Sequence, residues 1–551
     1  MSASSGKESN LGLSKDGTAI ELLEPVYQPE PVQRKTSRTT WPDEEGRDAA
    51  ITTPPLEQEH TIPPISKYRA ALLISTVALV TTLNSMLGGL LIVSLPTLAH
   101  DIHLKDSLLL WPASVNSLAC GCTLLLSGSV ADVVGGKKVY LTGVFLLSIT
   151  TVACGVCTSG IQLILFRAAQ GVALALAFPS MVILITRSIP TGTYRNLAFA
   201  CLGAGQPFGF SIGLVLGGVF VQTIGWRYGY YIAAVITFVV FIISIYAVPP
   251  DPNLGSQSWS TLRQRLRTEI DWVGCTLLST SLGLFSYVLS VLSSGASHFV
   301  SPVSLTLFSV AVALLPLFGF WVTRQERLGR VAIMPPSLWR NTVFTSLCVT
   351  IFVVWGIFNA IQFFLTLFFQ DIQDLDPIQT SIRFLPMVVT GAATNFLTGW
   401  LVKRVRADAL VLGSALLQAI SPLLLAVVKP SWSYWSCAFI ATACAPICAD
   451  VLFTVANLVI TQIYPHKTHG LAGGVFNTIS NIGNSVGLAV TSVIASSVTL
   501  AAKGRRWETE KDKLLDGYRA TFWTCFAANI LVLGVVGFGL RKIGKVGIKT
   551  D

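Results

Sequence analysis

The residues with the clearest chemical potential are two charged side chains inside long apolar stretches. Asp450 lies in the stretch that begins near residue 433, and Arg167 lies about two helical turns into the one that begins near residue 160. A charge inside an apolar segment is costly unless it faces a cavity or a partner. A carboxyl in such surroundings can bind and release a proton near neutral pH. We therefore expect Asp450, together with Arg167, to handle protons.

Polar side chains recur at helical spacing in several apolar stretches. Steps of three or four residues place each set on one face of a helix, and a polar face inside a membrane should turn inward. The sets are Trp355, Asn359, Gln362, Thr366 and Gln370; Asp450, Thr454, Asn457 and Thr461; and Asn477, Asn481 and Asn484, with Asn84 and Gln170 in two further stretches. These faces can line a cavity, or they can join neighbouring helices by hydrogen bonds, as membrane bundles often do.

These residues belong to about fourteen long apolar stretches between residues 69 and 542. Each stretch is near the ~20 residues that a helix needs to cross hydrocarbon. The stretches begin near residues 70, 107, 138, 160, 196, 229, 271, 300, 342, 379, 409, 433, 469 and 519. The sequence therefore predicts an all-α membrane protein with 14 transmembrane helices.

Composition agrees with this prediction, because 52% of the 551 residues are hydrophobic and only 12% are charged. Most of the basic residues gather in alternate loops, such as 137–138, 263–267, 324–340 and 403–406. Lysine and arginine mark cytoplasmic loops, so this pattern puts both termini in the cytoplasm. One exception is the last loop, 501–519, which carries six bases and four acids. We expect a plasma-membrane protein and no nucleic-acid partner, although the net charge is +10.

The cysteines do not form a metal or disulfide pattern. All 11 lie within apolar stretches, and the one CxxC pair, Cys154 and Cys157, lies in mid-helix among small apolar residues. We therefore expect no disulfide framework, no metal site and no cofactor.

Loops and composition divide the chain into five parts. Residues 1–68 are rich in proline, serine and acids, which predicts a disordered cytoplasmic tail rather than a signal peptide. Residues 69–248 and 342–540 each hold six spans, and 541–551 form a second tail. Between the two halves, residues 249–341 hold two more spans. Within that linker, residues 256–270 have an apolar face and a face with three arginines, which predicts an interfacial helix or an ordinary linker helix.

The loop after the second span carries a specific motif. It reads Gly128-Ser-Val-Ala-Asp132-Val-Val-Gly135-Gly-Lys137-Lys138. This resembles the G-x-x-x-D-R-x-G-R-[RK]-[RK] loop of the major facilitator superfamily, although Val133 and Gly136 replace the usual arginines. The resemblance implies a cytoplasmic gate made by Gly128, Asp132, Gly135, Lys137 and Lys138, in which a carboxylate at a helix end meets nearby bases. The alternative is a basic membrane anchor with turn glycines.

Two further motifs support this resemblance, which covers roughly residues 70–540. Arg167-Ala-Ala-Gln170-Gly171 looks like the R-x-x-Q-G motif of proton-coupled facilitators, although a purely structural arginine is the alternative. The fifth span resembles the glycine-proline motif of facilitator antiporters and holds Gly205, Pro207, Gly209, Gly213 and Gly217. Four glycines on one face let another helix pack closely, and Pro207 should bend the helix.

Shorter stretches narrow the resemblance to the fourteen-span drug:proton antiporter branch, and within it to a fungal subgroup akin to the aminotriazole-resistance proteins. They include Asp271-Trp-Val-Gly274, Leu108-Leu-Leu-Trp-Pro112 and the sequence from Ala449 to Asn457. The branch often carries an aspartate in the first span where this chain has Leu87, which shifts the expected proton coupling to Asp450 and Arg167. The resemblance also implies a cavity lined by spans 1, 4, 9 and 12. We expect Asn84, Gln170, Trp355, Asn359, Gln362, Thr454, Asn457, Asn477 and Asn481 to line it.

These features predict a monomeric secondary transporter in the lipid bilayer, and not an enzyme. The leading hypothesis is export of small organic compounds, such as drugs, toxins or secondary metabolites, by proton antiport with alternating access. One alternative is export of a small polar solute, an inorganic weak acid or a weak base. A non-transporting membrane sensor is a third reading. A cavity with aromatic residues beside its amides would favour the first hypothesis, and a narrow amide-lined cavity the second.

Overall fold

The computed structural model describes residues 66–105, 108–190, 193–249, 259–293, 301–402, 404–464, 466–502 and 509–541. Within these ranges the chain is helical and contains no β-strand, and 14 helical segments are long and apolar enough to cross a membrane. The predicted all-α membrane fold is therefore confirmed. Of the predicted tails, 1–68 and 541–551, only residues 66–68 and 541 are described, and the first helix already begins at Lys67.

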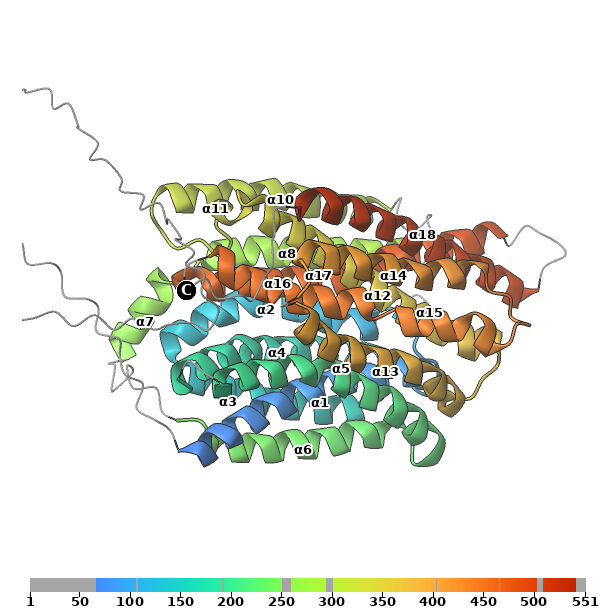
Figure 1. Cartoon of the computed structure of the whole chain (residues 1–551), viewed down its shortest axis with the longest axis horizontal. Coiled ribbons are helices and arrows are strands. Elements are labelled where there is room, and N and C mark those ends of the chain that lie inside the picture. The colour runs from blue at the N-terminus through green and yellow to red at the C-terminus, as the bar shows by residue number, and fades with distance from the viewer. Residues whose placement is uncertain are drawn as a thin grey trace, which may run out of the picture. The chain divides into compact units, whose positions relative to one another are not determined.

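The first six spans pack together along their length (Figure 1). Helix α1 packs against α5 and α6, α2 against α4, and α3 against α4 and α6. The bounds are α1 Lys67–Asp101, α2 Trp111–Val134, α3 Gly136–Val156, α4 Gly160–Ser188, α5 Thr193–Thr223 and α6 Trp226–Ala247.

The linker contributes α7 (Trp259–Thr268), α8 (Trp272–Ser293), α10 (Pro302–Arg327) and the short α11 (Pro336–Trp339). The predicted amphipathic helix is α7, in which Leu262 and Leu266 are half-buried while Arg263 and Arg267 are exposed. Helices α8 and α10 pack together, and α8 also contacts α2 and α17. The additional pair of spans therefore lies over a seam between the two halves.

Asp271 joins the parts of this linker. Its carboxylate accepts hydrogen bonds from the backbone N–H of Gly274 at 2.8 Å, the indole of Trp321 at 2.9 Å and the backbone N–H of Ile333 at 3.3 Å. These donors come from the start of α8, from α10 and from the segment before α11. A buried carboxylate with three donors is satisfied, so we interpret Asp271 as structural.

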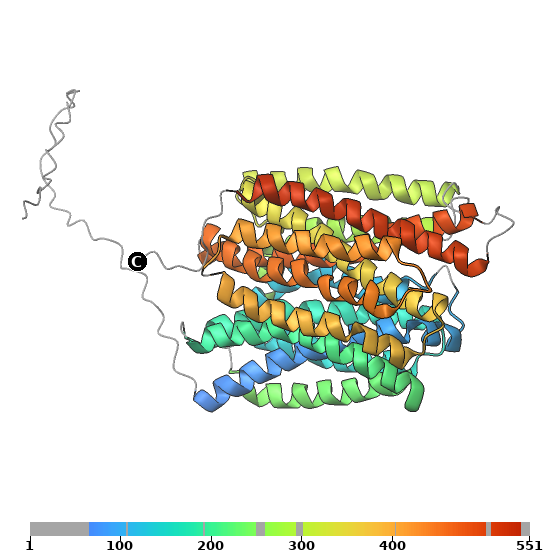
Figure 2. The same ribbon diagram turned by 45° about the vertical axis from the view of Figure 1, so that its right-hand side comes forward.

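The second half comprises seven main helices among the described residues (Figure 2). Helix α12 packs against α17 and α18, α13 against α15 and α16, and α14 against α15, α16 and α18. The bounds are α12 Thr342–Leu367, continued by the π-helix η3 Phe368–Ile372, then α13 Pro377–Leu401, α14 Ala407–Val427, α15 Ala438–Cys444, α16 Ile447–Ile463, α17 His466–Ala502 and α18 Glu510–Gly539.

Two helices differ from the sequence prediction. The twelfth span is not one helix: α15 ends at Cys444 and α16 begins at Ile447, because Pro446 lacks the backbone N–H that would continue the ladder. The last helix begins at Glu510 rather than near 519, since Thr509 and Asp512 form a capping box that stabilises three polar turns before the apolar part.

Glycines allow α1 and α5 to pack backbone against backbone. A Cβ atom added at Gly209 or Gly213 would collide with the carbonyl of Thr82 or Met86, and one at Gly217 would lie 3.0 Å from the Leu90 oxygen. Gly205 meets α1 in the same way. The predicted glycine face is therefore occupied by α1, while the helical run of α5 continues through Pro207.

The second half repeats this arrangement between α12 and α17. A Cβ at Gly483 would collide with the Phe352 backbone, and one at Gly487 would collide with Gly356. Small residues let helices approach closely where lipid offers no hydrophobic driving force. Both halves thus contain close helix pairs at glycines, which also include α2 with α4 at Gly171 and α17 with α18 at Gly517.

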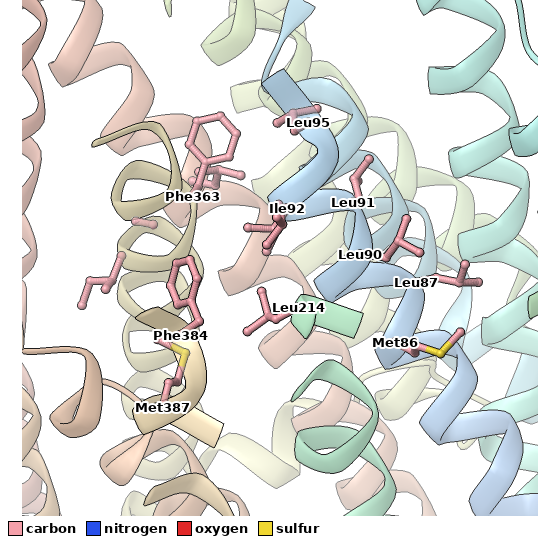
Figure 3. Packing of buried hydrophobic residues seen from close by; sticks show 14 of the residues in the cluster. Met86, Leu87, Leu90, Leu91, Ile92, Leu95, Leu214, Phe363, Phe384 and Met387 are labelled. Atoms are coloured by element: carbon pink, nitrogen blue, oxygen red, sulfur yellow. The ribbon is translucent and has the colours of Figure 1, made fainter. Parts of the chain in front are cut away.

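The two halves meet through side chains and through a close backbone contact, in which a Cβ added at Gly218 of α5 would lie 2.6 Å from the Pro377 carbonyl oxygen of α13. Gln370 donates to the Val93 carbonyl at 2.9 Å, and Ser381 donates to the Leu214 carbonyl. Figure 3 shows Leu214 of α5 and Ile92 of α1 near Phe384 and Met387 of α13, within one buried cluster. The seam between the halves is therefore packed in the region where α1 and α5 approach their ends and α13 begins.

We predict that Gly209→Ala or Gly213→Ala lowers the thermal stability of the detergent-solubilised protein. Alanine normally stabilises a helix over glycine by ~1 kcal/mol, but here its methyl group would force α5 away from α1, at a cost of roughly 1–3 kcal/mol. The control is Gly203→Ala on the same helix, because a Cβ there meets nothing within 4 Å. Equal melting temperatures for all three variants would contradict the account of this contact.

Candidate transport cavity

A cavity of about 220 Å³ lies between the two halves, near the middle of the helices that surround it. Four helices of each half contribute to its wall: α1, α2, α4 and α5 from the first, and α12, α13, α16 and α17 from the second. The wall carries amide, aromatic and aliphatic side chains together with two charged residues, Arg167 and Asp450. Membrane transporters commonly place their binding sites at such a position between repeats.

Asp450 is positioned by the break in the twelfth span. It lies in the first turn of α16, where the positive end of the helix dipole favours a carboxylate. Its Oδ2 atom is buried and has no hydrogen-bond partner among the described residues. The same atom lies 3.1 Å from the place where a Cβ would stand at Gly391, so this glycine of α13 makes room for it.

The break also leaves a backbone carbonyl that needs a partner inside the bilayer. Gln418 of α14 donates to the Ala445 carbonyl at 3.0 Å, and Asn529 of α18 donates to the Gln418 side chain at 3.2 Å. Gln418 and Asn529 are fully buried. This pair of amides holds the broken helix, and thereby Asp450, against its neighbours.

Arg167 is 2% exposed and is held by hydrogen bonds rather than by an acid. It donates to the Pro112 carbonyl at 3.2 Å and to the Gln170 side-chain oxygen at 2.6 Å. Gln170 in turn donates to the Thr151 hydroxyl at 2.8 Å. This chain links α2, α4 and α3, and no ion pair of Arg167 is found among the residues that the structure describes.

The structure brings eight of the eleven residues predicted for coupling and binding to the cavity wall. They are Asp450, Arg167, Asn84, Trp355, Asn359, Gln362, Asn477 and Asn481. Gln170, Thr454 and Asn457 are absent from the lining. The amide of Gln170 points to α3, and the amide of Asn457 donates to the Phe453 carbonyl of its own helix at 2.8 Å. A functional role for each lining residue stays a prediction.

Several lining residues were missed by the sequence-based prediction. Asn116, Gln206 and Asn395 lie on α2, α5 and α13, outside the four spans that the resemblance pointed to. Asn484, in contrast, belongs to the polar set expected from the sequence, and it lines the cavity together with Asn477 and Asn481 of α17. The aromatic part of the wall comprises Phe178, Phe210, Trp355, Phe358 and Phe453.

The loop at residues 128–138 makes side-chain contacts with α4 and with the end of α6, both in the first half. Asp132 pairs with Arg187 of α4 at 3.2 Å, and Lys137 donates to the carbonyls of Ile245 and Val248 at the end of α6. Gly135 has φ of 110°, which favours glycine, and it ends α2 so that α3 can start at once. Gly128 packs against Pro179, and Lys138 is exposed. The gate between the halves stays a prediction.

Comparison with known proteins now identifies the family. The family model of the Major Facilitator Superfamily matches residues 77–487 and 387–549. The chain belongs to the major facilitator superfamily, whose members are membrane transporters rather than enzymes. The structure resembles that of a bacterial homologue of the human lysosomal transporter Spinster, with a TM-score of 0.59 at 17% identity, covering 87% of this chain and 98% of the other. This likeness concerns the fold alone.

Three curated relatives illustrate the range of the family around this chain. "MFS-type transporter 1" of Pyricularia oryzae is 42% identical over 91% of this chain and 89% of its own length. The "Low affinity ammonium transporter" of Saccharomyces cerevisiae is 24% identical over 78% of this chain and 79% of its own length. "Efflux pump terJ" of Aspergillus terreus is 24% identical over 83% of this chain and 85% of its own length.

We predict that Gln170→Leu destabilises the protein by about 1–3 kcal/mol, because it leaves the buried Arg167 and Thr151 without their partner. The melting temperature in detergent should fall clearly. Gln264→Leu on the exposed face of α7 is the control and should melt like the wild type. An unchanged melting temperature for Gln170→Leu would show that the arginine chain contributes no stability.

Proposed function

We propose that this transporter exports small organic compounds in exchange for protons. The observation that carries the proposal is the cavity wall, which combines five aromatic side chains with amides from both halves and one carboxyl, Asp450, among the described lining residues. Aromatic surface suits an organic cargo, and a few polar groups orient it. The relationship to an efflux pump supports the direction of transport.

The proposed mechanism is alternating access around this cavity. Glycines allow close helix contacts within each half, and the halves also approach closely where Gly218 of α5 faces the Pro377 backbone of α13. Rocking of two rigid halves would expose the cavity to one side of the membrane at a time. Asp450 would release its proton when cargo enters and rebind one after cargo leaves, and Arg167, on the same cavity wall, would assist this proton exchange.

We also propose that the chain belongs to the fourteen-span drug:proton antiporter branch, in a fungal subgroup akin to the aminotriazole-resistance proteins. The 14 candidate spans and the similarity to fungal transporters support this placement. The alternating basic loops support cytoplasmic termini, and an exporter of this kind would act at the plasma membrane.

A second candidate cargo is a small polar weak base. The similarity to an ammonium transporter favours it, as do the many amides of the cavity wall. The five aromatic side chains favour the larger organic compound, because an ammonium-sized solute would leave most of their surface without contact.

The experiment that tests the proposed function uses proteoliposomes with an imposed pH gradient and a trapped pH-sensitive dye. A panel of aromatic cations, neutral compounds and anions of similar size is added to the outside, and proton movement is followed. We expect at least one organic compound to move protons through the protein. Proton movement with ammonium alone would favour the second candidate, and none with any compound would contradict proton exchange.

We predict that Asp450→Asn abolishes this coupled transport and leaves membrane insertion and melting temperature near the wild-type values. Asparagine keeps the size and hydrogen-bonding atoms of the side chain but cannot carry a proton. The measurement is proton-driven accumulation of the compound identified in the panel. Accumulation at the wild-type rate would remove Asp450 from the coupling mechanism.

We predict that Asp132→Ala slows export and favours the conformation that is open toward the loop at 128–138. Loss of one solvent-exposed contact at a helix end can shift a balance by ~0.3–1 kcal/mol, which is roughly 2- to 5-fold in population. Stability should change little, because the pair with Arg187 is solvent-exposed. Labelling of a cysteine placed at Ser480 in the cavity, tested from each side, reports the balance, with Asp408→Ala as control. Unchanged labelling and export would exclude Asp132 from the gate.

A further inference from the structure

A groove of about 640 Å³ lies on the surface of the second half and shares no lining residue with the central cavity. One wall belongs to α13, where Ile382, Leu385 and Val389 follow one another at helical spacing and are all exposed. The other wall belongs to α15 and to the short 3-10 helix η4 (Tyr434–Ser436) before it. Apolar side chains exposed on a membrane span face the lipid, so the groove opens toward the bilayer.

Three aromatic rings form a cluster on the second wall. The ring centroids of Tyr434 and Trp435 are 5.5 Å apart, and those of Trp435 and Phe439 are 5.2 Å apart. The Tyr434 hydroxyl donates to the backbone carbonyl of Arg383 at 2.7 Å, which holds the cluster against α13. Trp435 is 71% exposed. Tryptophan and tyrosine gather at the level of the lipid headgroups, so this part of the groove lies near the membrane surface.

Arg383 brings a positive charge into the groove. Its guanidinium lies over the rings of Phe369 and Tyr434, 5.5 and 5.6 Å from their centroids. Its Nη1 atom donates to the side-chain oxygen of Gln373 at 3.2 Å, and the nitrogen of Gln373 donates to the Pro430 carbonyl at 3.1 Å. Among the described residues, no acid forms an ion pair with Arg383 and no second acceptor meets its guanidinium.

This arginine therefore needs an anion from outside the chain that the structure describes. Arg383 lies six residues after Pro377, which is about 9 Å along α13. A charge on the lipid side of a span is costly unless it is paired or reaches the headgroups. The phosphate of a phospholipid is the anion that a bilayer supplies at this level. A guanidinium suits it, because its planar fork can donate two hydrogen bonds to one phosphate.

We propose that this groove binds one glycerophospholipid, whose phosphate accepts hydrogen bonds from Arg383 and whose acyl chain lies along the apolar face of α13. The groove and the lipid have the same polarity. The charge lies near the start of the helix, and the apolar face continues through Leu385 and Val389 toward its middle. The inference goes beyond the proposed function and does not depend on the nature of the cargo.

Other occupants fit this groove less well. Free phosphate could bind Arg383, but it would leave the apolar face of α13 without a partner. In a symmetric dimer the same patch of each copy meets itself. The residues that line the groove include no acid that could pair with Arg383 of a second copy. A phospholipid supplies the anion and the apolar chain together.

The test uses the full-length protein, freed of lipid in detergent, and native mass spectrometry with three probes. Dioleoyl-phosphatidylglycerol carries a phosphate and two chains, dioleoylglycerol carries the chains alone, and inorganic phosphate is the anion alone. We expect one tightly bound phosphatidylglycerol, with a Kd at least about tenfold lower than that of dioleoylglycerol, because a hydrogen bond to a charged group is lost without the phosphate. Inorganic phosphate at the same concentration should not displace it.

Two variants locate the lipid in the groove. Arg383→Gln removes the charge, and Val389→Trp fills the apolar part while keeping the arginine. Each should raise the Kd of phosphatidylglycerol at least about tenfold. The matched controls are Lys429→Gln, a cation of the same region that does not line the groove, and Val235→Trp on α6, because Val235 and Val389 are both 64% exposed. Both controls should bind the lipid like the wild type.

Three results would overturn the inference. The first is an unchanged Kd in both groove variants, with near-UV circular dichroism confirming their fold. The second is equal binding of dioleoylglycerol, or displacement of the lipid by inorganic phosphate, which would indicate an apolar site or a simple anion site. The third is a dimer in the lipid-free protein that Val389→Trp dissociates and Val235→Trp does not, because a second copy would then occupy the groove. If Arg383→Gln does not fold, Val389→Trp on the lipid-facing surface still decides.

Discussion

The structure depends on one constraint of the bilayer: a polar atom inside it must be paired within the protein or face a cavity. The amides of Gln418 and Asn529 meet this constraint at the broken twelfth span, where they reach the free Ala445 carbonyl. Gln170 meets it for Arg167. Asn84 and Asp450 instead belong to the wall of the central cavity, although one side-chain oxygen of each is buried without a partner among the described residues.

A second constraint acts on packing, because lipid gives helices no hydrophobic reason to associate. Contact between backbones at Gly209 and Gly213 in one half, and at Gly483 and Gly487 in the other, supplies the association that lipid does not. The seam between the halves also contains a close contact, where Gly218 of α5 faces the Pro377 backbone of α13, and this contact would have to change if the halves move. The cavity lies in that seam, so a motion of the halves would change access to Asp450.

Much of this arrangement could be predicted from the sequence. Span length gave the fourteen helices, and the spacing of Gly205 to Gly217 predicted a close helix contact, but neither pattern names the partner helix. Helical spacing also placed polar residues on one face without fixing where that face points, so Gln170 was expected in the cavity and instead binds Thr151 of α3. Asn116 and Asn395 belong to no polar stripe, and only the packing of α2 and α13 brings them to the wall. Pro446 is the residue in the sequence that explains the helix break before Asp450, but the apolar run around it favoured one continuous span.

The central claim is that two rigid halves give alternating access to this shared cavity. Electron–electron distance measurements on two spin-labelled pairs test it most directly. One pair, at Lys138 and Arg404, reports the loop end, and the other, at His103 and Lys429, reports the opposite end; all four residues are exposed. When Asp450 is replaced by asparagine or the pH is changed, the account predicts that one distance lengthens as the other shortens. Distances that stay fixed, or that lengthen together, would contradict it.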